Sequence, residues 1–285
     1  MSTQPEKHIL KRASYEVPGT LRFALQLIHS MRSKSLLFTL SLIVFVYQPA
    51  GAATRDVELF YKIYVGGFHV IDLKAEIGLR HSDYEFSAKA KSVGMIGRMF
   101  PWWMKAYSRG EIFESAVKPM VAGQRNSWRG KDRFIDLKFT DGVATIDRIA
   151  PEPKTDDRDK VPFEMRVGVM DLASAIISII RKMDAGQSCQ AQMPVFDGRR
   201  RYDLMVAPDG NDIIKPSGYT PYIGETVNCR LTIDKKAGFK KRDESGWNDR
   251  ERSARIWMAK PFGDVPPVPV RLTINTPLGF IIAHL

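Results

Sequence analysis

The residues that could do chemistry in this chain form no recognisable catalytic arrangement. The sequence has no G-x-S-x-G nucleophile elbow, no P-loop, no G-x-G-x-x-G and no H-E-x-x-H motif. Beyond residue 53 its only histidines are His69, His81 and His284, and nothing in their spacing brings them together. A metal site or a catalytic triad would need such convergence. We therefore expect no enzyme activity, no metal and no cofactor.

One segment concentrates adaptable apolar side chains. Gly94–Met104 (GMIGRMFPWWM) mixes methionine and aromatic residues with glycines and a proline. Such side chains suit the mouth of a site for a lipid or another apolar ligand. The alternative is a loop folded over the end of a sheet as part of the core. The candidate ligand-binding residues of this segment are Met95, Met99, Phe100, Trp102 and Trp103.

Two arginine-rich segments could bind anionic groups. In Arg125–Arg133 (RNSWRGKDR), cations surround a tryptophan, which suits phosphate-bearing headgroups or sugars. The alternative there is a solvated hairpin tip. In Val195–Leu204 (VFDGRRRYDL), three arginines follow an Asp-Gly turn, and their side chains point alternately to the two faces of a strand. The alternative there is a buried ion pair between one of these arginines and an acidic residue. The candidate binding residues are Trp128, Arg129, Arg199 and Arg201.

The two cysteines, Cys189 and Cys229, form an even pair. In an exported chain such a pair indicates one disulfide. Two free thiols are the alternative. A zinc site has less support, because no second pair of ligands lies at metal spacing.

The elements that must position these residues are mostly strands. In Phe68–Leu79, apolar residues such as Ile71 and Leu73 alternate with Asp72 and Lys74, which gives one dry and one solvated face. Asp-Gly pairs at 141–142, 197–198 and 209–210 are predicted hairpin turns. The pattern predicts a meandering antiparallel sheet or a barrel. The other predicted strands are Val57–Val65, Tyr84–Lys91, Ile135–Phe139, Val143–Ile149, Val227–Asp234, Val268–Ile274 and Phe280–His284.

One segment breaks this pattern. Asp171–Met183 (DLASAIISIIRKM) has apolar residues at helical spacing. Asp171 can cap the start of a helix, and Arg181 and Lys182 suit its end. The sequence therefore predicts one central apolar helix within a mainly β domain.

The N-terminal region resembles an export signal. Arg32 and Lys34 precede an apolar run, Leu36–Tyr47, which is shorter than the roughly 20 residues that span a bilayer. Small residues follow, with predicted cleavage at Ala52 or Ala53. We predict an extension or mis-called start at residues 1–30 with translation from Met31, although initiation at Met1 stays open, a signal peptide at 31–52, and one β-rich periplasmic domain at 53–285.

Composition is that of a soluble globular protein with a basic balance. Hydrophobic residues make up 44% of the 285, charged residues make up 26%, and the net charge is +11. This charge favours anionic partners such as phospholipid headgroups or lipopolysaccharide. Nucleic acid would also fit chemically, but an export signal argues against it. Export machinery is an expected partner during secretion.

Four segments in order resemble a known family. They are F-Y-K-I-Y-V-G-G-F at 60–68, D-L-A-S-A at 171–175, F-D-G-R-R-R-Y-D at 196–203, and Trp257 followed by P-V-P-V-R-L at 267–272. Together they resemble domain of unknown function 3108, a family of bacterial exported proteins. The resemblance implies a periplasmic location and a curved antiparallel sheet or half-open β-barrel, similar to the folds of periplasmic lipoprotein carriers. It also implies that the helix at 171–183 could plug the half-barrel. It implies no established activity and no catalytic residue.

These observations favour a non-enzymatic periplasmic protein that binds an amphipathic or lipid-like ligand, or a partner protein of the envelope, in the concave face of a curved sheet. The alternative is a structural or scaffolding envelope protein without a ligand, in which all the apolar residues would pack in the core. A third possibility is a cell-wall hydrolase, which would need two carboxylates, or His69 or His81 with a nucleophile, in one cleft.

Overall fold

A computed structural model describes residues 55–114, 116–152, 158–239, 254–276 and 279–285, all within one compact unit, Ala50–Leu285. The predicted signal peptide at 31–52 and the extension at 1–30 lie outside the described residues. The same holds for the cleavage sites at Ala52 and Ala53.

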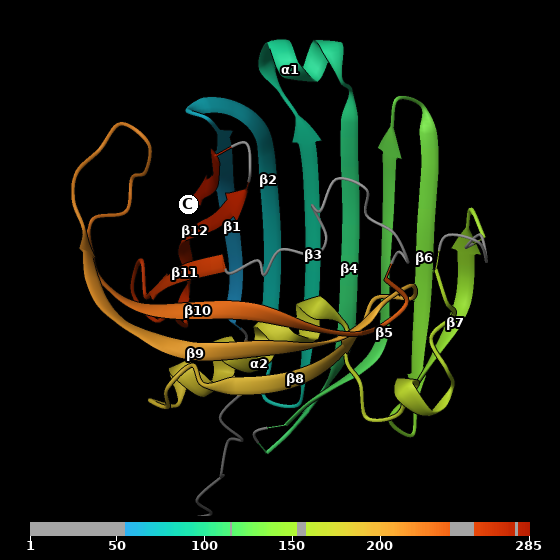
Figure 1. Cartoon of the computed structure of the whole chain (residues 1–285). Helices are drawn as coiled ribbons and strands as arrows, with labels where there is room; N and C mark the ends of the chain where they lie inside the picture. The colour runs from blue at the N-terminus through green and yellow to red at the C-terminus, as the bar shows by residue number, and fades with distance from the viewer. Residues whose placement is uncertain (1–54, 115, 153–157, 240–253, 277–278) are drawn as a thin grey trace, which may run out of the picture. The chain divides into compact units, whose positions relative to one another are not determined.

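The described chain forms one antiparallel sheet of thirteen strands in a nearly closed barrel (Figure 1). The strand order is β7-β6-β5-β4-β3-β2-β1-β13-β12-β11-β10-β9-β8, so every pair of consecutive strands except β7 and β8 is hydrogen-bonded, and β1 joins the two halves through β13. The strands are β1 (Arg55–Val65), β2 (Phe68–Leu79), β3 (Asp83–Ser92), β4 (Trp102–Phe113), β5 (Ala116–Trp128), β6 (Lys131–Thr140), β7 (Val143–Ala150), β8 (Ala191–Phe196), β9 (Arg201–Ile214), β10 (Gly224–Ala237), β11 (Ala254–Ala259), β12 (Val268–Thr276) and β13 (Gly279–His284).

The barrel is left incomplete between its edge strands, β7 and β8. Among the described residues these two strands do not pair with each other. The segment between them makes one bridge to each, Val143 with Val167 and Met170 with Val195. A short 3-10 helix, η1 (Glu164–Arg166), lies in that segment. The mainly β, barrel-like prediction is therefore confirmed.

Strict alternation explains which face of the sheet is buried. In β1, the buried Leu59 and Tyr61 alternate with the exposed Phe60 and Lys62. Since successive side chains point to opposite faces, one face joins the core and the other meets solvent. The same rule predicts the solvated positions of β2 and β3. We call the buried side the core face and the opposite side the outer face.

The core face packs around the helix α2 (Leu172–Asp184), which contacts β4, β5 and β8. Ile177, Ile179 and Ile180 are almost fully buried in a core cluster that also draws on β1–β4 and β8–β12. The predicted helix at 171–183 is confirmed, with Asp171 as its N-cap. Figure 1 shows α2 beside β8, near one end of the barrel. None of the helices in the described part of the chain is long and apolar enough to cross a membrane.

A buried polar cluster fixes the start of α2. The Asp171 carboxylate accepts hydrogen bonds from the backbone N–H groups of Ala173 and Ser174, and from the Ser174 hydroxyl. The Ser108 hydroxyl on β4 also donates to it, at 3.0 Å. Tyr84 on β3 hydrogen-bonds both serine hydroxyls. The helix cap is therefore tied directly to the sheet.

Two local expectations were wrong. The Asp209-Gly210 pair is not a hairpin turn but lies inside β9, opposite a register shift between Val227 and Cys229 of β10. Gly210 has a φ of 83°, so the Asp-Gly signal marks a bulge within a strand instead of a chain reversal. Gly94–Met104 is not a loop packed as core either. It forms the short helix α1 (Gly94–Met99), which has no buried residue, followed by the start of β4.

The structure joins Cys189 and Cys229 in a disulfide, as the sequence predicts. Both residues are almost fully buried, and the bond links the segment before β8 to the middle of β10. The bond therefore ties β8, which has only one strand partner, to a strand two places further into the sheet.

We expect replacement of Cys189 and Cys229 by serine to lower the free energy of unfolding by about 4 kcal/mol, because the bond closes a loop of 40 residues in the unfolded chain. Urea unfolding of oxidised, reduced and Cys189→Ser/Cys229→Ser protein measures this. Equal midpoints for the three samples would contradict the expectation.

Asp171→Ala should lower the free energy of unfolding by about 2 kcal/mol, since it removes the helix cap and leaves buried hydroxyls without their acceptor. Asp171→Asn should cost less, because its side-chain oxygen still accepts from the helix N-terminus. Asp147→Ala, which removes an exposed aspartate that pairs with Lys138, is the matched control and should stay within about 0.5 kcal/mol of wild type. An equal loss for the Ala and Asn variants would show that the cap does not matter.

Candidate functional site

The most developed hollow of the described residues crosses the outer face of β1–β4. It has a volume of about 840 Å³ and ends against the loop that joins β9 to β10. Most of its exposed lining is apolar. We call it the transverse groove. Its lining residues are Phe60, Tyr61, Lys62, Asp72, Leu73, Lys74, Lys89, Ala90, Lys91, Trp103, Met104, Lys105, Gly218, Tyr219, Thr220, Pro221, His284 and Leu285.

Strand register gives the groove two walls and a floor. Each wall is a row of residues that lie directly opposite one another on neighbouring strands, and the two rows are about 7 Å apart along the strands. The row between them contributes its backbone as the floor, since its side chains point to the core face. The middle row is Phe60, Lys74, Lys89 and Lys105; the rim row, nearer α1, is Lys62, Asp72, Lys91 and Trp103; the floor row is Tyr61, Leu73, Ala90 and Met104.

The middle row places like charges directly opposite one another. Lys74 faces Lys89, Lys89 faces Lys105, and Lys105 faces Arg125 on β5. Like charges at paired positions of adjacent strands destabilise a sheet. Lys74 is held by Glu58 and Glu76 at 2.5 and 2.7 Å, and these hydrogen bonds raise its pKa.

The other groove lysines are less well compensated: Lys62 and Lys91 share one opposite charge, Asp72, at their paired positions, whereas Lys89 has a lysine on each side. Within the described part of the chain, no carboxylate forms an ion pair with Lys62, Lys89 or Lys91. The Lys105 ammonium lies 5.8 Å from the centre of the Trp103 ring. Asp72 is the only acidic side chain in the lining, and it pairs with His69 at 2.8 Å. The groove therefore carries a surplus of solvent-facing positive charge.

The charge reverses toward the other end of the same strands. A second hollow of about 540 Å³ is lined by Asp56, Glu58, Glu76 and Glu85, with Arg80 as its one cation. Both hollows lie on the outer face of β1–β3. The basic groove is thus a local arrangement and not a general property of this surface.

An aromatic cluster forms the wall of the groove at the β9–β10 loop. Tyr219 packs edge-on to Tyr64 at 5.3 Å and stacks on His284 at 6.0 Å. The Thr220 hydroxyl donates to the Leu285 carbonyl, which holds the loop to the end of the sheet. Burial, reinforced by the charge of Arg271, lowers the pKa of His284, so its imidazole is neutral at pH 7.

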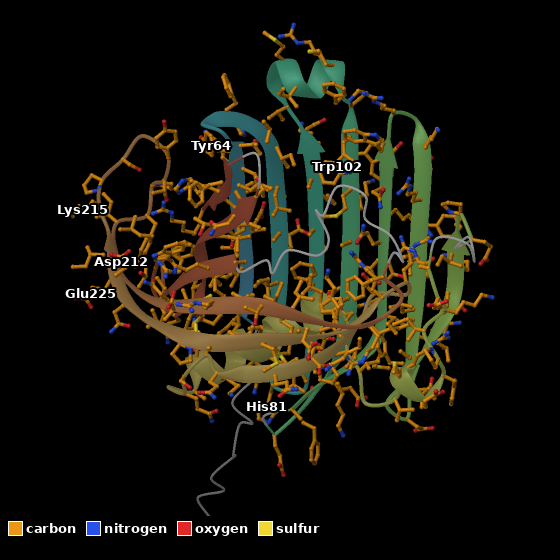
Figure 2. The ribbon with its side chains drawn as sticks, viewed as in Figure 1. Tyr64, His81, Trp102, Asp212, Lys215 and Glu225 are labelled. Carbon is orange, nitrogen blue, oxygen red and sulfur yellow. A yellow bond between two sulfur atoms is a disulfide. The ribbon has the colours of Figure 1, made fainter. Side chains whose placement is uncertain are left out.

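The structure brings several of the sequence-predicted ligand residues together near α1. Phe100 stacks on Trp128 at 6.3 Å, and the Arg129 guanidinium lies 4.9 Å from the Phe100 ring. Trp102 lies directly opposite Trp128, whereas Trp103 faces the other way and lines the groove. Figure 2 shows Trp102 and Tyr64 toward the same end of the molecule. Met95 and Met99 are exposed on α1. A binding role for all of these residues stays a prediction.

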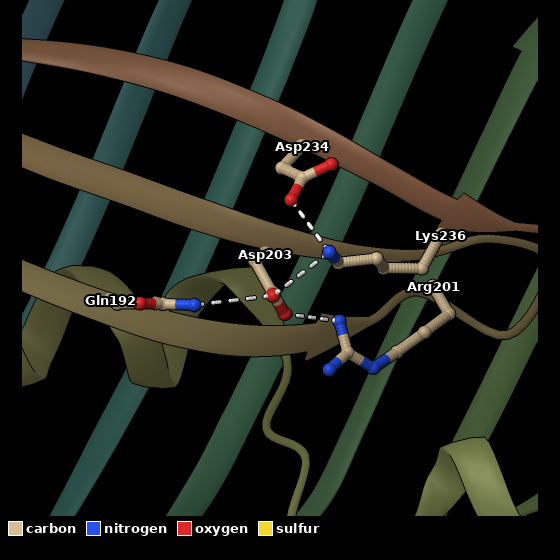
Figure 3. A network of polar contacts seen from close by, with 5 residues as sticks. All are labelled: Gln192, Arg201, Asp203, Asp234 and Lys236. Atoms are coloured by element: carbon tan, nitrogen blue, oxygen red, sulfur yellow. Dashed lines mark hydrogen bonds and ion pairs between the residues drawn. The ribbon is translucent and has the colours of Figure 1, made fainter.

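The other two candidates, Arg199 and Arg201, lie at the β8–β9 hairpin and contact other parts of the chain. Arg199 donates to the Pro151 carbonyl at 2.6 Å. Arg201 pairs with Asp203 at 2.5 Å, and their side chains are only 14% and 10% exposed (Figure 3). The alternative of a nearly buried ion pair therefore describes Arg201.

Figure 3 shows that Asp203 is the centre of a small network. Gln192 on β8 donates to it at 3.4 Å, and Lys236 on β10 lies 3.7 Å away while also pairing with Asp234. Burial alone would raise the pKa of Asp203, but the hydrogen bond from Arg201 and the nearby cations outweigh it, and the pKa is lowered. This network holds three strands in register.

The three histidines do not form a metal or catalytic site. His69 and His284 both contact the Tyr64 ring, at 5.3 and 5.9 Å, but His81 lies at the opposite end of the strands (Figure 2). No cluster of three or more metal-ligating side chains occurs among the described residues. The serine–aspartate cluster at Asp171 is buried under α2, where a substrate has no access.

Sequence reasoning missed the groove lysines as a site. The alternation of Asp72, Lys74, Lys89 and Lys91 with apolar residues marks them as solvated positions. Their grouping depends on the pairing of three strands, which no single segment reveals. One sequence feature could have indicated this basic surface: Phe86–Gly110 contains five cations and no acidic residue.

Comparison with known proteins gives a family but no function. No curated protein matches the chain. Among solved structures, a β-barrel-like protein of domain of unknown function DUF1849 from Brucella abortus is similar over 82% of this chain and 96% of its own, with 11% identity and a TM-score of 0.47. The model of the family described as "Protein of unknown function (DUF3108)" matches residues 61–285, as the sequence resemblance predicts, and the chain belongs to this family.

Proposed function

We propose that this protein is a non-enzymatic binding protein of the bacterial envelope whose ligand is an anionic amphiphile held in the transverse groove. Such a ligand combines an apolar part with a phosphate or carboxylate group. The proposal includes export through the predicted signal peptide to the periplasm. There the protein would meet the anionic amphiphiles of the envelope.

The observation that carries the proposal is the row of three lysines, Lys74, Lys89 and Lys105, at directly paired positions across β2–β4. Lys89 faces a lysine on each side, and no carboxylate of the described residues pairs with it. A phosphate or carboxylate between the middle row and the rim row would reach Lys89 and Lys91 together. It would replace cross-strand repulsion with charge-assisted hydrogen bonds.

The apolar lining supports an amphiphile over a simple anion. Phe60, Trp103 and Tyr219 border the groove, and lysine side chains add their methylene stems. A volume of about 840 Å³ falls within the range of small-molecule sites. The groove lies on the outer face, whereas the sequence favoured the concave face, where α2 is packed.

A scaffolding role without a ligand is the second candidate, because α2 and its partners fill the core face as a scaffold would require. The two candidates differ at the groove. A scaffold does not need three lysines in a row, and its stability would be indifferent to anionic amphiphiles.

The first experiment measures ligand chemistry directly. Delipidated protein should bind a fluorescent fatty acid, and a long-chain alkyl phosphate should displace it, since both present an anion and an apolar chain. The uncharged alcohol of the same chain length should displace it at least about tenfold more weakly, the loss expected for one charge-assisted contact. Inorganic phosphate alone should not compete. Equal displacement by the acid and the alcohol would rule out the lysine rows as the recognition element.

The second experiment separates binding from stability. Lys89→Glu places a carboxylate between Lys74 and Lys105, so the melting temperature should rise by about 2 °C as repulsion becomes attraction. The same change should weaken binding of the fluorescent fatty acid by about tenfold or more. Lys118→Glu, on β5 and outside the groove, is the matched control and should leave binding unchanged. Unaltered binding by the Lys89 variant would sink the proposed function.

A further inference from the structure

Exposed apolar side chains gather at one end of the strands. Met95 and Met99 on α1 are 71% and 62% exposed, and Phe68, at the neighbouring start of β2, is 73% exposed. Ile96 is also exposed, and no residue of α1 is buried. We call Phe68, Met95, Ile96 and Met99 the apolar tip. Figure 1 shows α1 beyond the ends of β3 and β4.

The tip is held in place by the sheet beneath it. The Val93 N–H donates to the Val70 carbonyl, which fastens the start of α1 to β2. The Ser92 hydroxyl accepts from the Trp102 N–H at 2.9 Å and closes the base of the turn. A Cβ on Gly97 would come within 2.7 Å of the Ser92 carbonyl, so glycine allows this close approach. The apolar side chains are therefore presented on a fixed support.

Two arginines lie beside the tip. Arg98 lies on α1 itself. The backbone N–H of Arg129 donates to the Pro101 carbonyl, next to α1. The guanidinium of Arg129 lies over the rings of Phe100 and Trp128. The 25 residues Phe86–Gly110 contain no Asp or Glu. Exposed apolar side chains flanked by two arginines complement a bilayer surface that carries anionic headgroups.

We propose that the apolar tip docks this protein onto an anionic lipid surface. Methionine and isoleucine side chains would enter the boundary between headgroups and acyl chains, and Trp128 would lie at headgroup depth, where tryptophan is enriched. Arg98 and Arg129 would meet the phosphates. The six residues of α1 are too few to span a bilayer, so the contact is interfacial.

Docking at this end would bring the transverse groove next to the membrane. The rim row, with Lys91 and Trp103, begins directly beside α1. This inference is independent of the proposed function, because a tip can bind lipid whether or not the groove takes a ligand.

The test places an environment-sensitive nitrobenzoxadiazole label on Met95→Cys in the full chain, with vesicles of phosphatidylcholine plus phosphatidylglycerol. We expect a blue shift and a severalfold rise in label fluorescence, since the tip enters an apolar medium. The same label on Phe113→Cys, an exposed apolar residue at the opposite end of β4, is the control and should not respond. A local label isolates the tip from the apolar run at 36–47.

Charge is tested separately. Vesicles of phosphatidylcholine alone, or the Arg98→Glu/Arg129→Glu variant, should lower the vesicle affinity reported by the Met95 label by about tenfold or more. A Met95 label that does not respond to anionic vesicles would overturn the proposal, as would an equal response at position 113. A response that depends on protein concentration without vesicles would overturn it in favour of a second copy of this chain. None of these three results would affect fatty-acid binding in the groove.

Discussion

The packing of α2 against the core face is the constraint on which the other features of this molecule depend. A thirteen-stranded sheet that does not pair its edge strands has to bury one face without the help of full closure. The helix supplies the missing apolar surface, and Asp171 fixes its start to Ser108 on β4 and, through Ser174, to Tyr84 on β3. Ile177, Ile179 and Ile180 are almost fully buried there, so the helix is an integral part of the core.

The outer face of the sheet follows from the alternation of side chains along each strand. A strand that buries alternate residues must expose the others, so β1–β4 offer a regular array of solvent-facing positions. Their side chains are sorted by sign, with acids such as Glu58 and Glu85 toward one end and Lys89, Lys91 and Lys105 toward the other. A randomly mixed surface would pair opposite charges across strands. The middle row departs from that pairing, and the proposed ligand site rests on this departure.

Sequence patterns within single segments predicted the fold well. They failed for features that depend on which residues are paired across neighbouring strands. The alternation in Phe68–Leu79 and the helical spacing in Asp171–Met183 are properties of one segment, and both were confirmed. The disulfide needed only the count of cysteines and an assumed compartment. By contrast, the groove depends on which residue lies opposite Lys89, and Asp209-Gly210 became a bulge because β10 runs past it. Register is decided by the whole sheet, so single segments could not reveal either feature.

The like-charge row also bears on how stability and function are divided in this chain. Substitution of the middle lysine by an acid would favour the folded state, so selection for stability alone does not explain three adjacent lysines. Arg201 is different, because its ion pair with Asp203 stabilises the β8–β9 hairpin. Residues that weaken the sheet and lack partners are therefore better guides to function here than the arginine-rich motif that is more conspicuous in the sequence.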